Sequence, residues 1–122
     1  MFAIKINTVF SAAHNLVDYN GVCENCHGHN WKVQLTVAKD SLGADGMVMD
    51  FTVAQHILNR FVDKLDHKYL NELEFFKNIS PTSEKVAYLI YKNISRQIER
   101  DGLKITEIEV WENEDSSACY IP

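Results

Sequence analysis

Two cysteines and two histidines fall within seven positions in the stretch CENCHGH, residues 23–29. Three chemistries accept part of this pattern. Cys23-x-x-Cys26-His27 is the attachment pattern of a c-type haem, and two thiols with two imidazoles can form half of a structural zinc site. Alternatively, Cys23 is a catalytic thiol beside a His-Gly-His metal clamp at positions 27–29. The rest of the chain must decide among the three.

Composition narrows the choice. The 122 residues carry a net charge of −5 and are 46% hydrophobic, which predicts one ordinary domain over residues 1–122. Scattered basic residues argue against nucleic-acid and membrane partners, and no apolar run approaches the ~20 residues of a membrane helix. The N-terminus resembles no export signal, so we expect a cytoplasmic protein. Haem attachment belongs to exported proteins, and three cysteines disfavour a disulfide framework; thiol chemistry or metal binding remains.

Alternating hydrophobicity predicts four strands. They are expected at residues 2–13, 29–38, 105–114 and 118–121. In the first strand the apolar face consists of Phe2, Ile4, Ile6, Phe10 and Ala12. In the second it consists of Trp31, Val33, Leu35 and Val37.

Two helices are expected between the second and third strands. Asp50 can cap the first one, and its apolar stripe is Val53, Ala54, Ile57, Leu58, Phe61, Val62 and Leu65. Ser80 can cap the second, with Pro81 at the first helical position, and Gly102 ends it. The order β-β-α-α-β-β predicts an α+β fold with a four-stranded antiparallel sheet and both helices on one face. Polar neighbours predict that His56 is exposed.

Three histidines share the apolar faces of two neighbouring strands. His27 and His29 lie at i and i+2 and project to the same side, and Gly28 removes a side chain that would crowd the backbone between them. His14 continues the parity of the first strand. Together they would form a three-histidine site that leaves a tetrahedral zinc one open position. The alternative is three separate polar residues at strand ends.

A closed structural zinc site would need four ligands, for which Cys23, Cys26 and Cys119 are available. Cys119 has apolar neighbours in the last strand, so we expect a buried and inert thiol. Cys26 directly precedes His27, so its side chain would point to the opposite face. We interpret Cys26 as a bystander.

Six stretches follow one another along nearly the whole chain: FSAAHNL, CENCHGHNW, GMVMDF, LDHKYLN, SPTSE and VWEN. In this order and spacing they resemble the 6-pyruvoyl tetrahydropterin synthase superfamily. The short spacing from Cys23 to His27 is similar to that of the branch that forms 6-carboxytetrahydropterin, since relatives of the 6-pyruvoyl type place two more residues there. Asn15 stands where many relatives carry arginine, so no triphosphate contact is assigned to it.

The resemblance implies a tunnelling fold, in which trimers close their sheets into a barrel and two trimers stack into a homohexamer with active sites between subunits. It implies that Zn²⁺ is bound by His14, His27 and His29, and that Cys23 is the catalytic thiol.

Further roles implied by the resemblance concern four polar positions. Asp66 and His67 would relay protons with the thiol, and Thr82 and Ser83 would contact a pterin ring. Glu112 would anchor that ring. From the residues alone, Asp66 and His67 fit equally well as a polar stop after the first helix.

Glu112 also has support from its place on the third strand. It continues the apolar side of Ile108 and Val110, where a hydrophobic residue would be expected. A carboxylate there needs partners, and the exocyclic amine and ring N–H of a pterin fit it bidentately. The alternative is a solvated or salt-bridged acid at a strand end.

The activity implied by the resemblance is a zinc-dependent lyase of queuosine and 7-deazapurine biosynthesis. Its small-molecule substrate would be 7,8-dihydroneopterin triphosphate, and its products 6-carboxy-5,6,7,8-tetrahydropterin, acetaldehyde and triphosphate. One alternative is the triphosphate lyase that forms 6-pyruvoyl tetrahydropterin. The other is a non-catalytic zinc-binding module, which would need neither the Asp66–His67 pair nor Glu112.

Overall fold

Two long antiparallel strands dominate the structure, a computed structural model that describes residues 1–16 and 26–122. These are β1 (Phe2–His14) and β2 (His27–Lys39), with thirteen residues each. They pair over their full length, from Phe2 opposite Lys39 to His14 opposite His27. The predicted alternation of β2 is confirmed, because its four apolar side chains are completely buried: Trp31, Val33, Leu35 and Val37.

In the described residues, five strands form one sheet in the order β3-β1-β2-β4-β5. β4 (Lys104–Asn113) pairs antiparallel with β2, and β5 (Ser116–Tyr120) pairs antiparallel with β4. β3 (Lys68–Tyr69) runs parallel to the end of β1. The prediction of four antiparallel strands is therefore wrong in this detail, since a two-residue strand is too short to show an alternating pattern.

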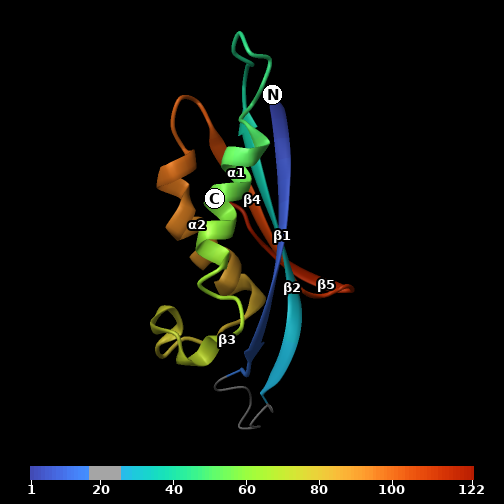
Figure 1. The fold of residues 1–122 in the computed structure, drawn as a ribbon, viewed down its shortest axis with the longest axis vertical. Coiled ribbons are helices and arrows are strands. Elements are labelled where there is room, and N and C mark those ends of the chain that lie inside the picture. The colour runs from blue at the N-terminus through green and yellow to red at the C-terminus, as the bar shows by residue number, and fades with distance from the viewer. Residues whose placement is uncertain (17–25) are drawn as a thin grey trace.

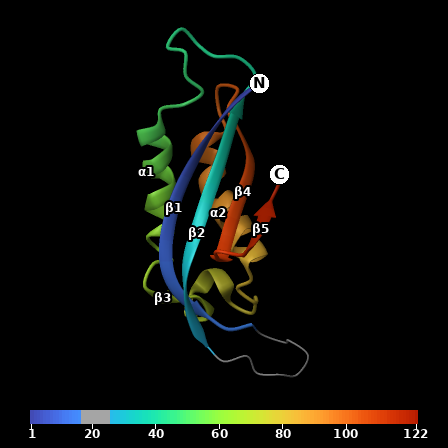
Figure 2. The same ribbon diagram turned by 90° about the vertical axis from the view of Figure 1, so that its right-hand side faces the viewer.

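Both helices cover one face of the sheet, as predicted (Figures 1 and 2). α1 (Phe51–Val62) begins at the predicted cap Asp50, whose carboxylate accepts a hydrogen bond of 2.8 Å from the backbone N–H of Thr52. His56 is exposed on α1, also as predicted. Val53 is wrong as a member of the buried stripe, because it is 45% exposed.

The second helix, α2 (Ser83–Ile98), begins later than the sequence suggested. Thr82, and not Ser80, is its cap, and the Thr82 hydroxyl accepts a hydrogen bond from the backbone N–H of Lys85. Pro81 lies outside the helix, and its carbonyl oxygen lies 2.9 Å from a ring nitrogen of His14. A contact between distant parts of the chain therefore prevails over the local capping signal.

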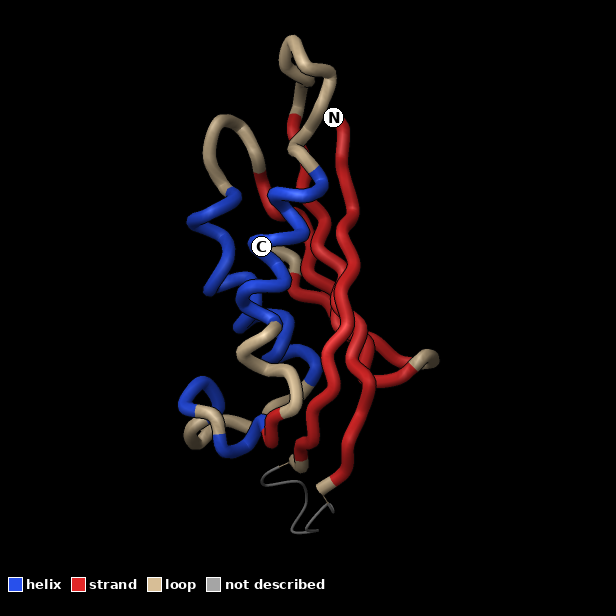
Figure 3. The backbone as a smooth tube through the Cα atoms, viewed as in Figure 1, coloured by secondary structure: helices blue, strands red, loops and turns tan. Residues whose placement is uncertain are grey.

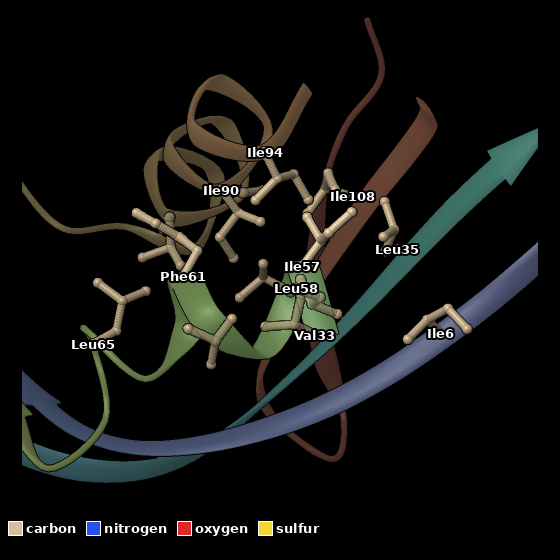
Figure 4. Close-up of a cluster of buried hydrophobic side chains, with 14 of the residues drawn as sticks. Ile6, Val33, Leu35, Ile57, Leu58, Phe61, Leu65, Ile90, Ile94 and Ile108 are labelled. Atoms are coloured by element: carbon tan, nitrogen blue, oxygen red, sulfur yellow. The ribbon is translucent and has the colours of Figure 1, made fainter. Parts of the chain in front are cut away.

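The hydrophobic core fills the space between the helices and the sheet (Figure 4). Leu58 of α1 and Ile90 and Ile94 of α2 pack against the inner face of β2 and β4, and all three are fully buried. Burial of each such side chain contributes about 1.5–3 kcal/mol. This core fixes the sheet from which the polar residues described below project.

Two short 3₁₀ helices, η1 (Leu70–Glu72) and η2 (Glu74–Phe76), connect β3 to α2. They lie at the end of the molecule where β1 ends and β2 begins (Figure 3). Within the two described ranges, no helix is both long enough and apolar enough to cross a membrane.

Candidate metal centre and substrate cavity

Three histidines meet where β1 ends and β2 begins. His14 lies directly opposite His27, and His29 lies opposite Ala12, so strand pairing alone brings them together. The ring centroid of His14 lies 5.3 Å from that of His27 and 5.2 Å from that of His29. A Cβ at Gly28 would meet nothing within 4 Å, so the expected crowding at this glycine is wrong within this chain.

Glu112 of β4 joins the three histidines. Its Oε1 lies 2.9 Å from Nε2 of both His14 and His29 and 3.8 Å from Nε2 of His27. One ligand atom from each of the four side chains lies within 4.8 Å of all the others, so this group could hold a metal ion. Glu112 was expected to anchor a pterin, and its contact with the histidines was not predicted, although its apolar parity places it on the same sheet face.

Hydrogen bonding fixes the ring of His14, which is only 1% exposed. Its Nδ1 lies 2.9 Å from the carbonyl oxygen of Pro81, and because a carbonyl can only accept, Nδ1 donates. In the neutral ring Nε2 then carries a lone pair that faces the Glu112 carboxylate. Two acceptors at 2.9 Å repel each other unless a cation lies between them, so this donor set fits a metal ion.

Trp31 forms the apolar wall of the histidine group. Its ring centroid lies 4.8 Å from that of His14 and 5.8 Å from that of His29, both edge to face. The indole N–H donates to the carbonyl oxygen of Ala12 at 3.2 Å. A rigid aromatic wall restricts the orientations that both imidazoles can adopt.

A cavity of about 340 Å³ lies beside the histidine group. Glu112 lines it together with Thr82 and Ser83 at the start of α2 and Ser117 of β5. This size is within the range of pockets that hold small molecules. The structure thus brings Thr82, Ser83 and Glu112 together at one cavity.

Asp66 and His67 form a pair at the edge of the sheet. Asp66 Oδ2 lies 3.4 Å from Nε2 of His67, while Asp66 Oδ1 accepts a 2.8 Å hydrogen bond from the backbone N–H of Ser11. His67 has a left-handed backbone with φ of 57°, which costs about 1–2 kcal/mol, and its N–H donates to the Ser11 carbonyl at 2.6 Å. The imidazole is 82% exposed and lines a shallow hollow with His29.

The three cysteines have different positions. Cys23 lies outside the described residues, and Cys26 is exposed directly before β2. Cys119 is exposed, so the expectation of a buried thiol is wrong. Partial desolvation of its sulfur, followed by the charges of Glu107 and Glu109, raises the pKa of Cys119. By strand alternation these three side chains lie on the sheet face opposite the histidines.

A mixed five-stranded sheet with two helices on one face, and a three-histidine group at one end, defines an α+β protein with a candidate metal centre. The chain belongs to the 6-pyruvoyl tetrahydropterin synthase family, whose model matches residues 3–122.

Similar proteins carry two related names. A 6-carboxy-5,6,7,8-tetrahydropterin synthase of Synechocystis sp. is 38% identical over 126 residues, covering 98% of this chain and 93% of the relative. A 6-pyruvoyl tetrahydrobiopterin synthase of Drosophila melanogaster is 31% identical over 125 residues, covering 91% and 74%. The solved 6-pyruvoyl tetrahydropterin synthase of Caenorhabditis elegans has a TM-score of 0.86 at 24% identity, covering 99% of this chain and 95% of the other, which shows the fold.

Proposed function

We propose that this chain is a zinc-dependent lyase that converts 7,8-dihydroneopterin triphosphate and water to 6-carboxy-5,6,7,8-tetrahydropterin, acetaldehyde and triphosphate. The reaction would serve queuosine and 7-deazapurine biosynthesis. The observation that carries the proposal is the convergence of three histidines with Glu112 beside the cavity at the start of α2. The name and 38% identity of the Synechocystis relative support it.

Zinc is the metal we propose for the histidine group. Three imidazoles with one position left open are a usual ligand set of catalytic zinc. When bound, zinc supplies Lewis-acid polarisation of the substrate's side-chain hydroxyls, which makes the neighbouring carbon-bound proton more acidic. The protein contributes orientation, since the Pro81 carbonyl fixes the ring of His14.

Proton transfer is the proposed task of Cys23 and His67. An unperturbed thiol has a pKa of about 8.5, so a basic Cys23 requires a nearby cation. His67 is the proposed proton shuttle, since histidine is the most common general acid–base residue, and its pairing with Asp66 favours one ring orientation. Because the His67 side chain is 82% exposed in the single chain, it is accessible to a substrate held between subunits.

Recognition of the pterin ring is the proposed task of Glu112, Thr82 and Ser83. The Glu112 side chain is 33% exposed, so its carboxylate is accessible from the cavity to an exocyclic amine and a ring N–H. The Thr82 hydroxyl oxygen caps α2, which leaves its proton available for a ligand.

We also propose a homohexamer built as a dimer of trimers. In the described part of the chain, the outer edge of β1 pairs with another strand only at Ala12 and Ala13, and β5 is the opposite edge of the sheet. Long open edges are normally covered, and pairing between copies would cover both. Sedimentation is expected to give a hexamer, whereas a stable and active monomer would contradict this assembly.

The 6-pyruvoyl product is the main alternative, and the Drosophila relative carries that name. Acetaldehyde distinguishes the two reactions, because the 6-pyruvoyl product keeps all three side-chain carbons. We would incubate the zinc-loaded protein with the substrate, measure triphosphate, and detect acetaldehyde through NADH consumption by alcohol dehydrogenase. The proposed reaction should give equal amounts of triphosphate and acetaldehyde. Triphosphate without acetaldehyde would indicate the alternative, and zinc binding without any turnover would indicate a non-catalytic module.

A further inference from the structure

The outer edge of β1 next to His14 is held mainly by polar groups from residues 66–71. Among the residues that the structure describes, only Ala12 and Ala13 pair with a strand there, through β3. Before them, Ser11 exchanges hydrogen bonds with the Asp66 carboxylate and the His67 N–H. These contacts fix the β1 backbone at Ser11, Ala12 and Ala13, directly before His14.

Beyond β3, a side chain takes the place of the missing strand. The backbone N–H of Asn15 donates to Asn71 Oδ1 at 3.0 Å, and Asn71 Nδ2 donates to the carbonyl oxygen of Asn15 at 2.9 Å. A carboxamide offers the same donor and acceptor as a peptide group. Asn71 therefore continues the pairing of β1 after the backbone has turned away into η1.

Tyr69 completes this contact from the same segment. Its hydroxyl donates to Oδ1 of Asn15. Desolvation, followed by electrostatic effects of Cys26 and Glu72, raises the pKa of Tyr69, so the phenol is protonated and can donate. The side chain and both backbone groups of Asn15 are thus engaged in hydrogen bonds within the chain.

We propose that Tyr69 and Asn71 are positioning residues for the metal centre, because they fix Asn15 and thereby the backbone from which His14 projects. The Pro81 carbonyl fixes the rotation of the His14 ring. The contacts of Tyr69 and Asn71 with Asn15, called the clamp below, fix the position of the His14 backbone. A shift of that backbone would carry Nε2 away from its place 2.9 Å from Glu112. The inference rests on the proposed zinc site.

The test measures zinc affinity directly and does not depend on turnover. Asn71→Leu keeps a similar size and removes both hydrogen bonds to Asn15. We expect a zinc Kd about tenfold to a hundredfold higher, the usual effect of losing residues that orient metal ligands without binding the metal, and an altered visible spectrum of the cobalt-substituted protein. The matched control is Asn93→Leu on α2, which loses one amide hydrogen bond to the Leu89 carbonyl and should bind zinc like the wild type.

Further variants separate positioning from general stability. Asn71→Asp keeps the acceptor for the Asn15 N–H, so its zinc Kd should lie between those of the wild type and Asn71→Leu. Tyr69→Phe should raise the Kd by a smaller factor, and it decides the matter if Asn71→Leu fails to fold. If the folded variants melt at lower temperatures but keep the wild-type zinc Kd and cobalt spectrum, the positioning role of Tyr69 and Asn71 is overturned and the zinc site is not. A wild type that binds no zinc would overturn the metal centre, and the clamp's role with it.

Discussion

Oε1 of Glu112 lies 2.9 Å from Nε2 of His14, although the two residues are 98 positions apart in the sequence. The acid expected to anchor a substrate thus touches the group expected to hold a metal. Glu112 is therefore either a fourth ligand or the link between the metal centre and the cavity.

Replacement of Glu112 by glutamine distinguishes these roles, because it keeps the shape and removes the charge. We expect Glu112→Gln to retain zinc, since three imidazoles suffice for a catalytic site. Turnover should fall at least ~100-fold with a raised KM, because a charge-assisted pair to the pterin is lost. Metal content and kinetics are measured on the same preparation, and zinc loss as severe as in the histidine variants would identify a fourth ligand instead.

The three histidines of the proposed zinc site should determine metal content. We expect about one zinc per chain in the wild type and a large loss in His14→Ala, His27→Ala and His29→Ala, since each variant leaves two imidazoles. Metal analysis of purified protein checks this. His56→Ala is the matched control, because His56 is exposed on α1 and lies outside the group. Near-normal zinc in all three variants would remove the proposed centre.

The two neighbouring thiols should differ in activity. Cys23→Ala is expected to lower turnover by about 10²–10⁴-fold, the usual contribution of a general base, with zinc content unchanged. Cys26→Ala should stay near the wild type, since Cys26 is exposed outside the histidine group. Steady-state rates at saturating zinc make the comparison. A reversed pattern would transfer the catalytic role to Cys26.

Asp50 should give a measurable pH dependence of stability. Hydrogen bonds from the Thr52 hydroxyl and backbone N–H hold the pKa of Asp50 below its usual range. A lowered folded-state pKa contributes stability that is present above the unfolded pKa of about 3.9 and is lost as the pH falls through the folded value. Melting temperatures of the wild type and Asp50→Ala should therefore differ most near neutral pH and converge below pH ~4. A difference that does not change with pH would contradict this contribution.

The long strands and the face of their histidines could be predicted because one side of the sheet is buried. Burial of one face imposes an alternation that reaches from Trp31 back to His29 and His27. The start of α2 could not be predicted, because Pro81 is recruited by His14 from 67 positions away. β3 could not be predicted either. Its neighbours Asp66 and His67 hold it beside β1 through hydrogen bonds to Ser11, and such distant contacts produce no local sequence pattern.

The sequence predicts on which strand face the site residues lie, but it does not predict which of them contact one another. Parity placed Glu112 on the inner face of its strand, but only the pairing of β4 with β2 brings it to the histidines. The role of Asn71 had no signal at all, because a side chain that replaces a strand looks like any polar residue after a turn.

Because His14 pairs with His27, a metal bound at the proposed site would also report on folding. If β2 slipped by one residue along β1, its side chains would exchange faces, and His27 and His29 would turn away from His14. A misaligned molecule would then offer one imidazole where an aligned one offers three. Zinc that binds only the aligned form would stabilise that form by mass action. The proposed zinc ligands would therefore also favour the native register of β1 and β2.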